Sequence, residues 1–279
     1  EIAEANTRAF KAGWNYGETS EDFAVSYEVA PAKLRPGTYR QVSGNTALSY
    51  GLIAASKLSG LPLFLGAYPI TPASDVLEQL AQMKHFGVRT FQAEDEIASI
   101  GMVCGAGWNG ARAFTATSGP GISLMNEFIG LAYFAEIPVT LIDVQRGGPS
   151  TGMPTRTQQS DILACAHASH GDTKHVLLLP EDPHECFEFA ALALDLADRL
   201  QTPIFVMSDL DIGMNQRLCA PFRWDESRRY DRGKVMTAAE LDPGKDFGRY
   251  KDVDGDGIPF RTYPGVPPDK GAYSTRGTS

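Results

Sequence analysis

Between residue 44 and about residue 214, short apolar runs alternate with longer amphipathic or apolar stretches, and glycine or proline separates them. Short runs of this kind predict strands and the longer stretches predict helices. Regular alternation of strands and helices indicates an α/β domain, a parallel sheet with helices on both faces. The predicted strands are 61–66, 88–92, 112–115, 139–144, 175–179 and 204–207, and the predicted helices are 45–58, 73–84, 96–107, 122–134, 158–166 and 183–200.

Capping residues mark the ends of two predicted helices. Asn45 suits an N-cap and Gly60 a stop for the first helix. The last helix has the clearest start, with Asp182 as N-cap, Pro183 as its first residue and Glu185 closing a capping box. Ligand sites of such a sheet lie at the carboxyl ends of its strands, so the segments that follow the strands are the candidates for chemistry.

The flanks of this pattern differ from its centre. Residues 1–42 are polar with scattered apolar positions and are interpreted as an extended N-terminal connector that lies on another part of the protein. The alternating region gives one domain over 43–215. Residues 216–279 are rich in Gly, Pro and Asp and are interpreted as a linker and the start of a further domain. The chain starts without methionine and ends in a loose polar segment, so both ends look like cuts through a longer chain.

Charge and cysteine content narrow the class of protein. The net charge of −9 disfavours nucleic acid as a partner, because phosphate backbones need clustered Lys and Arg. The four cysteines are far apart, without a CxxC, so no zinc ribbon or iron–sulfur cluster is expected within this chain. Free cysteines suit a reducing cytoplasm. No apolar run is long enough to span a bilayer, and no signal peptide is visible, so no membrane partner is expected.

Two candidate segments follow the first two predicted strands. In Tyr68-Pro69-Ile70-Thr71-Pro72, two prolines fix the backbone on either side of a hydroxyl, although an ordinary strand–helix turn has the same features. After the second strand, Glu94, Asp95 and Glu96 place three carboxylates at a helix N-terminus. They form either a solvated first turn or, because the following helix is apolar, a site with a buried glutamate that can exchange a proton with a heterocycle.

Two further segments follow the third and fourth strands. Residues 115–121 (TATSGPG) carry hydroxyls and a glycine turn whose backbone N–H groups suit an anion, or simply form a tight turn. Residues 145–155 (QRGGPSTGMPT) begin with a single arginine, Arg146, whose guanidinium can grip a carboxylate with two N–H groups. Ser150 and Thr151 can add hydrogen bonds. A flexible loop is the alternative for this segment.

In the C-terminal flank, Asp252, Asp254 and Asp256 reproduce the opening of an EF-hand loop, but Tyr263 stands where the bidentate glutamate belongs. A complete EF-hand is excluded. Two alternatives remain. One is a Ca²⁺ or Mg²⁺ site completed by backbone oxygens, and the other is a simple Asp/Gly turn without a metal.

Taken together, "YPITP", "EDEIA" followed by "GAGWNGARAFTATSGPG", and "QRGGPSTGMPTRTQQSD" resemble, in this order, the α subunit of the 2-oxoacid:ferredoxin oxidoreductase family. The resemblance covers about residues 40–215. It implies the pyrimidine-binding domain of a thiamin-diphosphate enzyme, in which one glutamate hydrogen-bonds the aminopyrimidine and favours its imino tautomer, so that the cofactor deprotonates itself at C2.

The resemblance assigns roles to individual residues. The activating glutamate of the family stands nine residues before a helix glycine, which Glu96 satisfies and Glu94 does not, so Glu96 is chosen and Glu94 is the fallback. Arg146 matches the arginine that binds the substrate carboxylate. Thr71 matches the hydroxyl near the substrate, and the segment Tyr68, Pro69, Ile70 belongs to the cofactor site. The "GGPSTG" loop, with Ser150 and Thr151 as substrate contacts, is typical of members that act on 2-oxoglutarate.

The resemblance also implies what lies on other chains. The GDG motif that holds Mg²⁺ and the diphosphate is missing, as are cluster cysteines, so a β subunit is expected to supply both, including a [4Fe–4S] cluster. Coenzyme A is the expected co-substrate, ferredoxin the electron acceptor, α₂β₂ the assembly, and the reductive TCA cycle the expected metabolic context. The alternatives are a pyruvate-type member, another thiamin-diphosphate reaction such as acetolactate synthesis, and a non-catalytic scaffold. A nucleotide-binding module is disfavoured, because no GxGxxG follows the first strand.

Overall fold

The computed structural model describes residues 1–20, 25, 27–228, 230–241 and 248–265. The chain divides into a first unit, Glu1–Gly37, and a second unit that starts at Thr38. The first unit contains helix α1 (Ile2–Thr19), in which no residue is buried. The prediction of an extended connector is therefore wrong for this stretch. Residues 2–12 include alanine, glutamate, arginine and lysine and contain no proline or glycine, which favours a helix. The apolar side chains of α1 are exposed, Phe10 and Trp14 among them.

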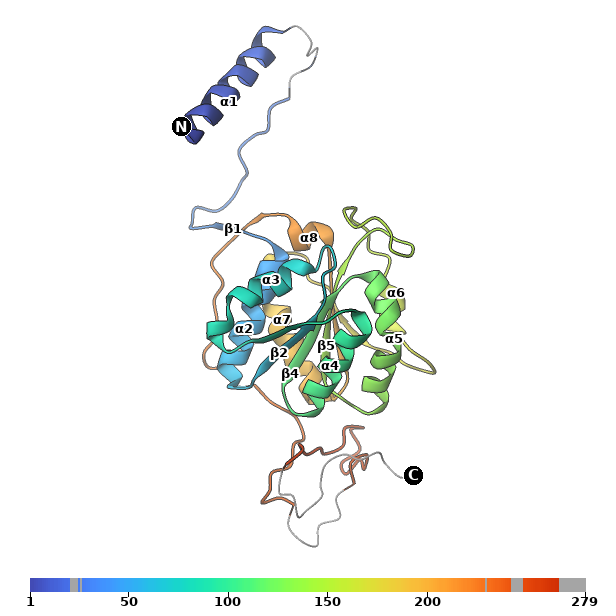
Figure 1. Cartoon of the computed structure of the whole chain (residues 1–279). Coiled ribbons are helices and arrows are strands. Elements are labelled where there is room, and N and C mark those ends of the chain that lie inside the picture. The colour runs from blue at the N-terminus through green and yellow to red at the C-terminus, as the bar shows by residue number, and fades with distance from the viewer. Residues whose placement is uncertain (21–24, 26, 229, 242–247, 266–279) are drawn as a thin grey trace. The chain divides into compact units, whose positions relative to one another are not determined.

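The second unit is built on a six-stranded, wholly parallel sheet with the order β3-β2-β4-β5-β7-β6 (Figure 1). This confirms the predicted fold class. Two more short strands, β1 (Arg40–Val42) and β8 (Arg217–Cys219), pair antiparallel and join the two ends of the domain. The sheet strands are β2 Leu63–Ala67, β3 Arg89–Gln92, β4 Arg112–Thr117, β5 Val139–Gln145, β6 Val176–Leu178 and β7 Pro203–Asp209.

Helices cover both faces of the sheet (Figure 1). One apolar core lies between the sheet and helices α2, α3 and α7, and the other lies under α4 and α5. The central strands β4, β5 and β7 are buried along their whole length, which explains their nearly continuous apolar sequences. The helices are α2 Gly44–Ser59, α3 Ser74–Gln82, α4 Glu96–Trp108, α5 Gly119–Phe134, α6 Ile162–Ala166, α7 Pro183–Leu200 and α8 Leu210–Met214, with a 3₁₀ turn at Lys84–Phe86.

Local chemistry explains most helix ends. Asp182 caps α7 by accepting from the Glu185 N–H, as predicted, while the Glu185 carboxylate accepts from the Glu181 N–H, one residue before the expected partner. For α2 the predicted N-cap is wrong. Ser43 caps the helix, and Asn45 is buried inside its first turn, where its amide donates to the Pro72 carbonyl. Gly60 ends α2 in the left-handed conformation, as predicted.

Helix α6 is shorter than predicted, because residues 158–161 belong to the loop before it. Gln158 and Gln159 use their side chains to tie that loop to the domain. The Gln158 side-chain oxygen accepts from the Gly148 N–H, and the Gln159 amide donates to Asp209. The polar residues that suggested an exposed helical turn thus serve loop contacts instead.

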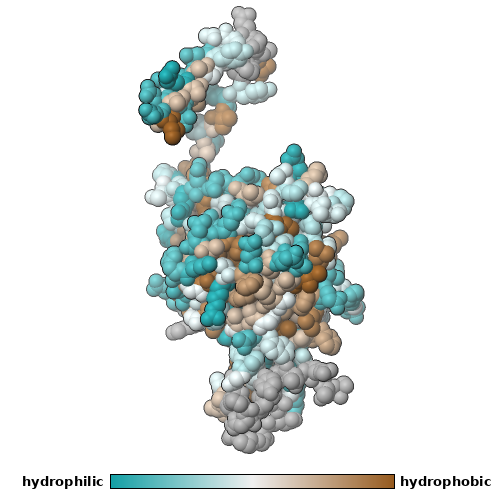
Figure 2. All heavy atoms as spheres, viewed as in Figure 1, coloured by the Kyte–Doolittle hydropathy of each residue, from teal (hydrophilic) through white to brown (hydrophobic). Residues whose placement is uncertain are grey.

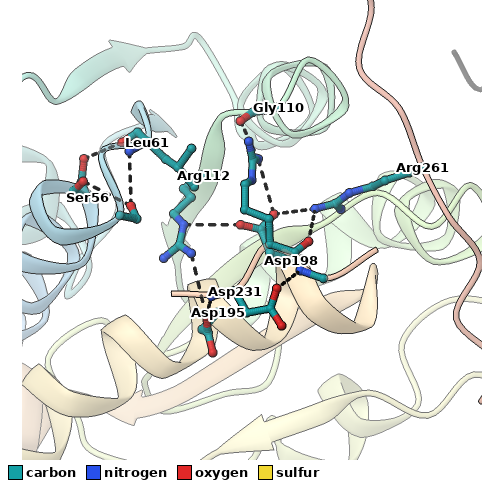
Figure 3. Close-up of polar contacts among 11 residues, drawn as sticks. Ser56, Leu61, Gly110, Arg112, Asp195, Asp198, Asp231 and Arg261 are labelled. Atoms are coloured by element: carbon teal, nitrogen blue, oxygen red, sulfur yellow. Dashed lines mark hydrogen bonds and ion pairs between the residues drawn. The ribbon is translucent and has the colours of Figure 1, made fainter. Parts of the chain in front are cut away.

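At the amino end of the sheet, a buried ion cluster connects the domain to the segment after β8 (Figure 3). Arg112 lies 3.4 Å from Asp198, which also accepts from Arg261 at 2.9 Å. Burial lowers the pKa of Arg112, and the charges of Asp198 and Asp195 oppose that shift. The described part of the predicted linker therefore packs on the domain.

Residues 266–279 lie outside the described residues, and the boundary at residue 215 stays a prediction. Among the described residues, no helix combines the length and apolarity needed to cross a membrane.

Candidate functional site

A cavity of about 630 Å³ opens at the carboxyl edge of the sheet, between the first turn of α5 and the loop that joins β5 to α6. Three of the predicted site residues, Arg146, Ser150 and Thr151, line it. The place agrees with the rule that parallel sheets bind ligands beyond the carboxyl ends of their strands. The remaining lining residues are Gly119, Pro120, Ser123, Leu124, Gly147, Gly148, Pro149, Gln158, Ser160 and Asp161.

Tyr68 and Glu96 meet in a second group of residues at the same edge. The buried Tyr68 hydroxyl is 2.6 Å from the Thr117 hydroxyl at the end of β4. Burial raises the pKa of Tyr68, the hydrogen bond with Thr117 lowers it, and the nearby Glu96 carboxylate raises it further. Gly121 closes this group from the side of α5, because a Cβ there would lie 2.0 Å from the Thr117 Oγ1 and 2.1 Å from the Tyr68 hydroxyl. Only glycine permits this close approach.

The three neighbouring carboxylates differ in their surroundings. Asp95 is the N-cap of α4, and its Oδ1 accepts from the Ala98 N–H at 2.7 Å. Glu94 is exposed in the turn before the helix. Glu96 is the first helical residue and is half-buried, and its Cγ would lie 3.4 Å from a Cβ on Gly121. Of the three, Glu96 is therefore the one that faces the Tyr68–Thr117 pair.

Arg146 lies at the base of the cavity and is only 7% exposed. Its guanidinium joins two loops, because Nη1 donates to the Thr71 carbonyl at 2.5 Å and Nη2 donates to the Thr151 carbonyl at 2.7 Å. Its buried Nε has no partner among the described residues. A guanidinium carries five N–H donors, so these contacts leave donors for an anion in the cavity. The predicted substrate arginine is thus also a connection that holds the site together.

The loop after Arg146 is ordered by its own backbone. The Gly147 N–H donates to the Arg156 carbonyl at 2.7 Å, and the Met153 N–H donates to the Gly147 carbonyl at 2.8 Å. Gly152 has a positive φ of 61°, and a Cβ there would lie 1.9 Å from the Gly147 oxygen. The Ser150 and Thr151 side chains are exposed at the rim of the cavity. A hydroxyl on this rim is free to meet a ligand, which a collapsed loop would not allow.

The segment 68–72 contributes backbone as much as side chains. The Thr71 side chain is exposed at the strand–helix turn, while its carbonyl receives the Arg146 bond. Pro69 is exposed and Ile70 is half-buried, and the Ile70 N–H donates to the Ser74 hydroxyl at 2.8 Å. The structure therefore links the turn to the cavity through Arg146.

Sequence reasoning missed two carboxylates beside the cavity. Asp143 lies inside β5 and is fully buried, and Asp161 lines the cavity at the start of α6. Burial raises the pKa of both, and the charge of Asp161 raises the pKa of Asp143 further. An aspartate within the otherwise apolar stretch "VTLIDV" was the available signal, because an ionisable residue inside a central strand is unusual.

The aspartates of the C-terminal flank form a separate cluster. Asp252, Asp254 and Asp256 are exposed, and one ligand atom of each lies within 4.8 Å of the others. The Lys234 ammonium donates to Asp254 at 2.5 Å and to Asp256 at 2.6 Å. A metal ion at this cluster would have to displace the lysine. The Ca²⁺ or Mg²⁺ site stays a prediction.

Residues 56–240 match the family model described as "Pyruvate flavodoxin/ferredoxin oxidoreductase, thiamine diP-bdg". Among curated relatives, the "2-oxoglutarate oxidoreductase subunit KorA" of Mycobacterium tuberculosis is 54% identical over 209 residues, which are 75% of this chain and 32% of the relative. The "2-oxoglutarate synthase subunit KorA" of Methanocaldococcus jannaschii is 44% identical over 62% of this chain and 46% of the relative.

A solved structure is similar as well. The 2-oxoglutarate:ferredoxin oxidoreductase of Magnetococcus marinus, with 2-oxoglutarate, coenzyme A and succinyl-CoA bound, superposes with a TM-score of 0.76 at 34% identity, over 98% of this chain and 45% of that chain. This chain spans a third to a half of the length of the two curated relatives and of that solved chain.

Proposed function

Because the chain belongs to the pyruvate flavodoxin/ferredoxin oxidoreductase family through its thiamin-diphosphate-binding domain, we propose that it is the cofactor-activating part of a 2-oxoglutarate:ferredoxin oxidoreductase. The observation that carries this proposal is the position of Glu96 at the start of α4, beside the Tyr68–Thr117 pair and Gly121. Glu94 is exposed and Asp95 is engaged in capping, so Glu96 is the carboxylate available for the pyrimidine.

The residues of this group fit a thiamin cofactor. Glu96 is half-buried at a helix N-terminus, where its carboxyl group can form a hydrogen bond with a bound cofactor. The glycine at 121 leaves room that a Cβ would fill, and the buried Ser118 hydroxyl has no partner among the described residues. When bound, thiamin diphosphate supplies the carbanion and electron sink for decarboxylation. In this chain Glu96 holds the pyrimidine nitrogen, and Tyr68, Pro69, Ile70 and Thr71 form the adjoining turn.

The substrate proposal rests on the Arg146 cavity. Its single cation and its hydroxyl rim suit a small dicarboxylate, with Arg146 binding one carboxylate and Ser150 and Thr151 hydrogen-bonding the other. Thr71 lies on the turn that Arg146 holds in place. The relatives named for 2-oxoglutarate support this substrate over pyruvate.

A partner chain completes the proposed enzyme. Large apolar side chains are exposed along α4 and α5, where brown atoms gather in Figure 2. Contiguous apolar surface of this kind is typical of an interface. The exposed residues include Ile97, Leu124, Leu131 and Phe134. In the proposal a β subunit holds Mg²⁺, the diphosphate and a [4Fe–4S] cluster in an α₂β₂ assembly of the cytoplasm, coenzyme A receives the acyl group, and ferredoxin receives the electrons.

Turnover of the assembled enzyme tests the proposal. The full-length protein, purified with its β subunit, should reduce a viologen dye with 2-oxoglutarate and coenzyme A, and should do so poorly with pyruvate. Arg146→Ala should raise the KM for 2-oxoglutarate about 100-fold, as expected for the loss of a charge-assisted carboxylate contact. Arg156→Ala is the matched control, since Arg156 is exposed in the same loop and its side chain contacts Thr155.

Three results would contradict parts of this reading. Consumption of pyruvate in preference to 2-oxoglutarate would make the chain a pyruvate-type member. Formation of acetolactate without dye reduction would indicate a different thiamin reaction. Equal kinetic constants for Arg146→Ala and the unmodified enzyme would favour a non-catalytic scaffold.

A further inference from the structure

The carboxyl groups of Asp143 and Asp161 are neighbours at the Arg146 cavity, which Asp161 lines. Asp143 comes from β5 and is completely buried, and Asp161 comes from the loop before α6. The Asp161 backbone is held in place because its N–H donates to the Gln145 side-chain oxygen at 3.1 Å. Each side chain acts on the other as a hydrogen-bonding neighbour.

One oxygen of each carboxyl group lacks a donor among the described residues. Asp143 Oδ1 and Asp161 Oδ2 are both buried and have no hydrogen-bond partner among the described residues. The other oxygen of Asp143 is 3.7 Å from the Cys165 thiol, which is a weak donor. Two buried acceptor oxygens side by side are satisfied when one proton lies between them, whereas two ionised carboxylates would repel each other.

The surroundings decide which group is ionised. The Asp161 carboxylate packs against the first turn of α5, where a Cβ on Gly119 would lie 2.6 Å from both of its oxygens. A helix N-terminus favours negative charge, and Arg146 acts on Asp161 in the same sense. Asp143 is buried deeper in the sheet, and Cys165 and Asp161 are the titratable groups among the described residues that shift its pKa. These surroundings favour a proton on Asp143 over one on Asp161.

The elements around the pair also carry Asp209 and Ser160. The first turn of α5 carries no ionisable side chain between Gly119 and Ser123. From β7, Asp209 is bonded to Gln159, and the hydroxyl of Ser160 is a hydrogen-bond neighbour of Asp161. Among the described residues, Arg146 is the cation whose charge lowers the pKa of Asp161.

From this geometry we propose that Asp143 and Asp161 hold one shared proton at the cavity and take up a second proton when a dicarboxylate binds to Arg146. Asp161 is then a specificity-determining residue: in its neutral form it donates a hydrogen bond to the ligand, and in its ionised form it repels it. This inference rests on the proposed function, since it presupposes a dicarboxylate in the cavity. The proton is taken up rather than released on binding, because a ligand that brings negative charge beside Asp161 raises the affinity of the pair for protons.

Calorimetry of the assembled enzyme tests the proposal with glutarate, a five-carbon dicarboxylate that has no 2-oxo group and does not react. Titrations in buffers of different ionisation enthalpy, between about pH 6 and 8, should show uptake of about half a proton or more per glutarate bound. Affinity should fall with rising pH by up to about tenfold per unit. In Asp161→Asn the uptake should vanish and the affinity should become independent of pH. Asp172→Asn, which makes the same change of charge on an exposed loop, should behave like the unmodified enzyme.

The outcomes separate the shared-proton inference from the proposed function. Glutarate binding without proton uptake, in an enzyme that turns over 2-oxoglutarate, overturns the shared-proton inference and leaves the proposed function standing. Proton uptake that persists unchanged in Asp161→Asn also overturns it. Absence of both glutarate binding and 2-oxoglutarate turnover contradicts the proposed function itself. If Asp161→Asn does not fold, the proton count of the unmodified enzyme still decides the question.

Discussion

Replacing Gly121 by alanine tests whether the Tyr68–Thr117 pair is as tightly enclosed as the structure shows. The new Cβ would lie 2.0 Å from the Thr117 Oγ1 and 2.1 Å from the Tyr68 hydroxyl, so both groups must move by about 1 Å or more to reach ordinary contact. Overpacking costs about 1–3 kcal/mol, and a buried hydroxyl left without its partner costs about 1–3 kcal/mol more. Alanine returns at most about 1 kcal/mol through helix propensity. The expected loss in the free energy of unfolding is therefore about 1–6 kcal/mol.

Urea unfolding followed by circular dichroism measures this loss. Gly105→Ala is the matched control, because Gly105 is an exposed residue of α4 and a Cβ there would meet nothing within 4 Å. The control should be unchanged or more stable by up to about 1 kcal/mol, since alanine is the better helix former. If Gly121→Ala were as stable as Gly105→Ala, the close packing of Tyr68, Thr117 and α5 would be refuted.

Two further predictions concern the segment that follows the sheet. Asp198→Asn removes the charge that Arg112 and Arg261 share and should lower the free energy of unfolding by about 3–5 kcal/mol in the same urea titration. The control, Asp211→Asn, breaks an exposed ion pair with Arg217 and should lower it by at most about 1 kcal/mol. Equal losses would show that the cluster is not buried. Lys234→Ala removes the ammonium that Asp254 and Asp256 bind. It should strengthen the binding of terbium, a luminescent substitute for calcium, by about tenfold or more. Unchanged terbium binding would contradict a metal site at these aspartates.

The sequence was most informative where local rules determine structure. Alternating strands and helices predicted the parallel sheet, and Asp182 followed by Pro183 predicted the start of α7, because capping depends on neighbours three residues away. Residues 1–19 show the limit of the same reasoning. Their polarity suggested an extended connector, yet helix propensity gives α1 without a buried face. Polarity alone does not separate an exposed helix from a loop.

The sequence predicted the site residues that lie within recognisable motifs. Glu96, Arg146, Ser150 and Thr151 follow strand ends, and the fold brings all of these strand ends to one edge of the sheet. What could not be predicted is which atoms meet. The bond of Arg146 to the Thr71 carbonyl joins residues 75 positions apart in the chain. The bond of Arg146 to Thr151 and the meeting of Asp143 with Asp161 depend on how the loop after β5 packs.

The central claim is that Glu96 activates the cofactor, and hydrogen–deuterium exchange at C2 of bound thiamin diphosphate tests it most directly. The measurement compares the unmodified α–β enzyme with Glu96→Gln and Glu94→Gln, using NMR of acid-quenched samples, in the absence of any 2-oxo acid. We expect Glu96→Gln to slow the exchange by about 100-fold or more, as loss of an acid–base group does, and Glu94→Gln to exchange at the normal rate. Normal exchange in Glu96→Gln, with slow exchange in Glu94→Gln, would contradict the account and assign the role to the other glutamate.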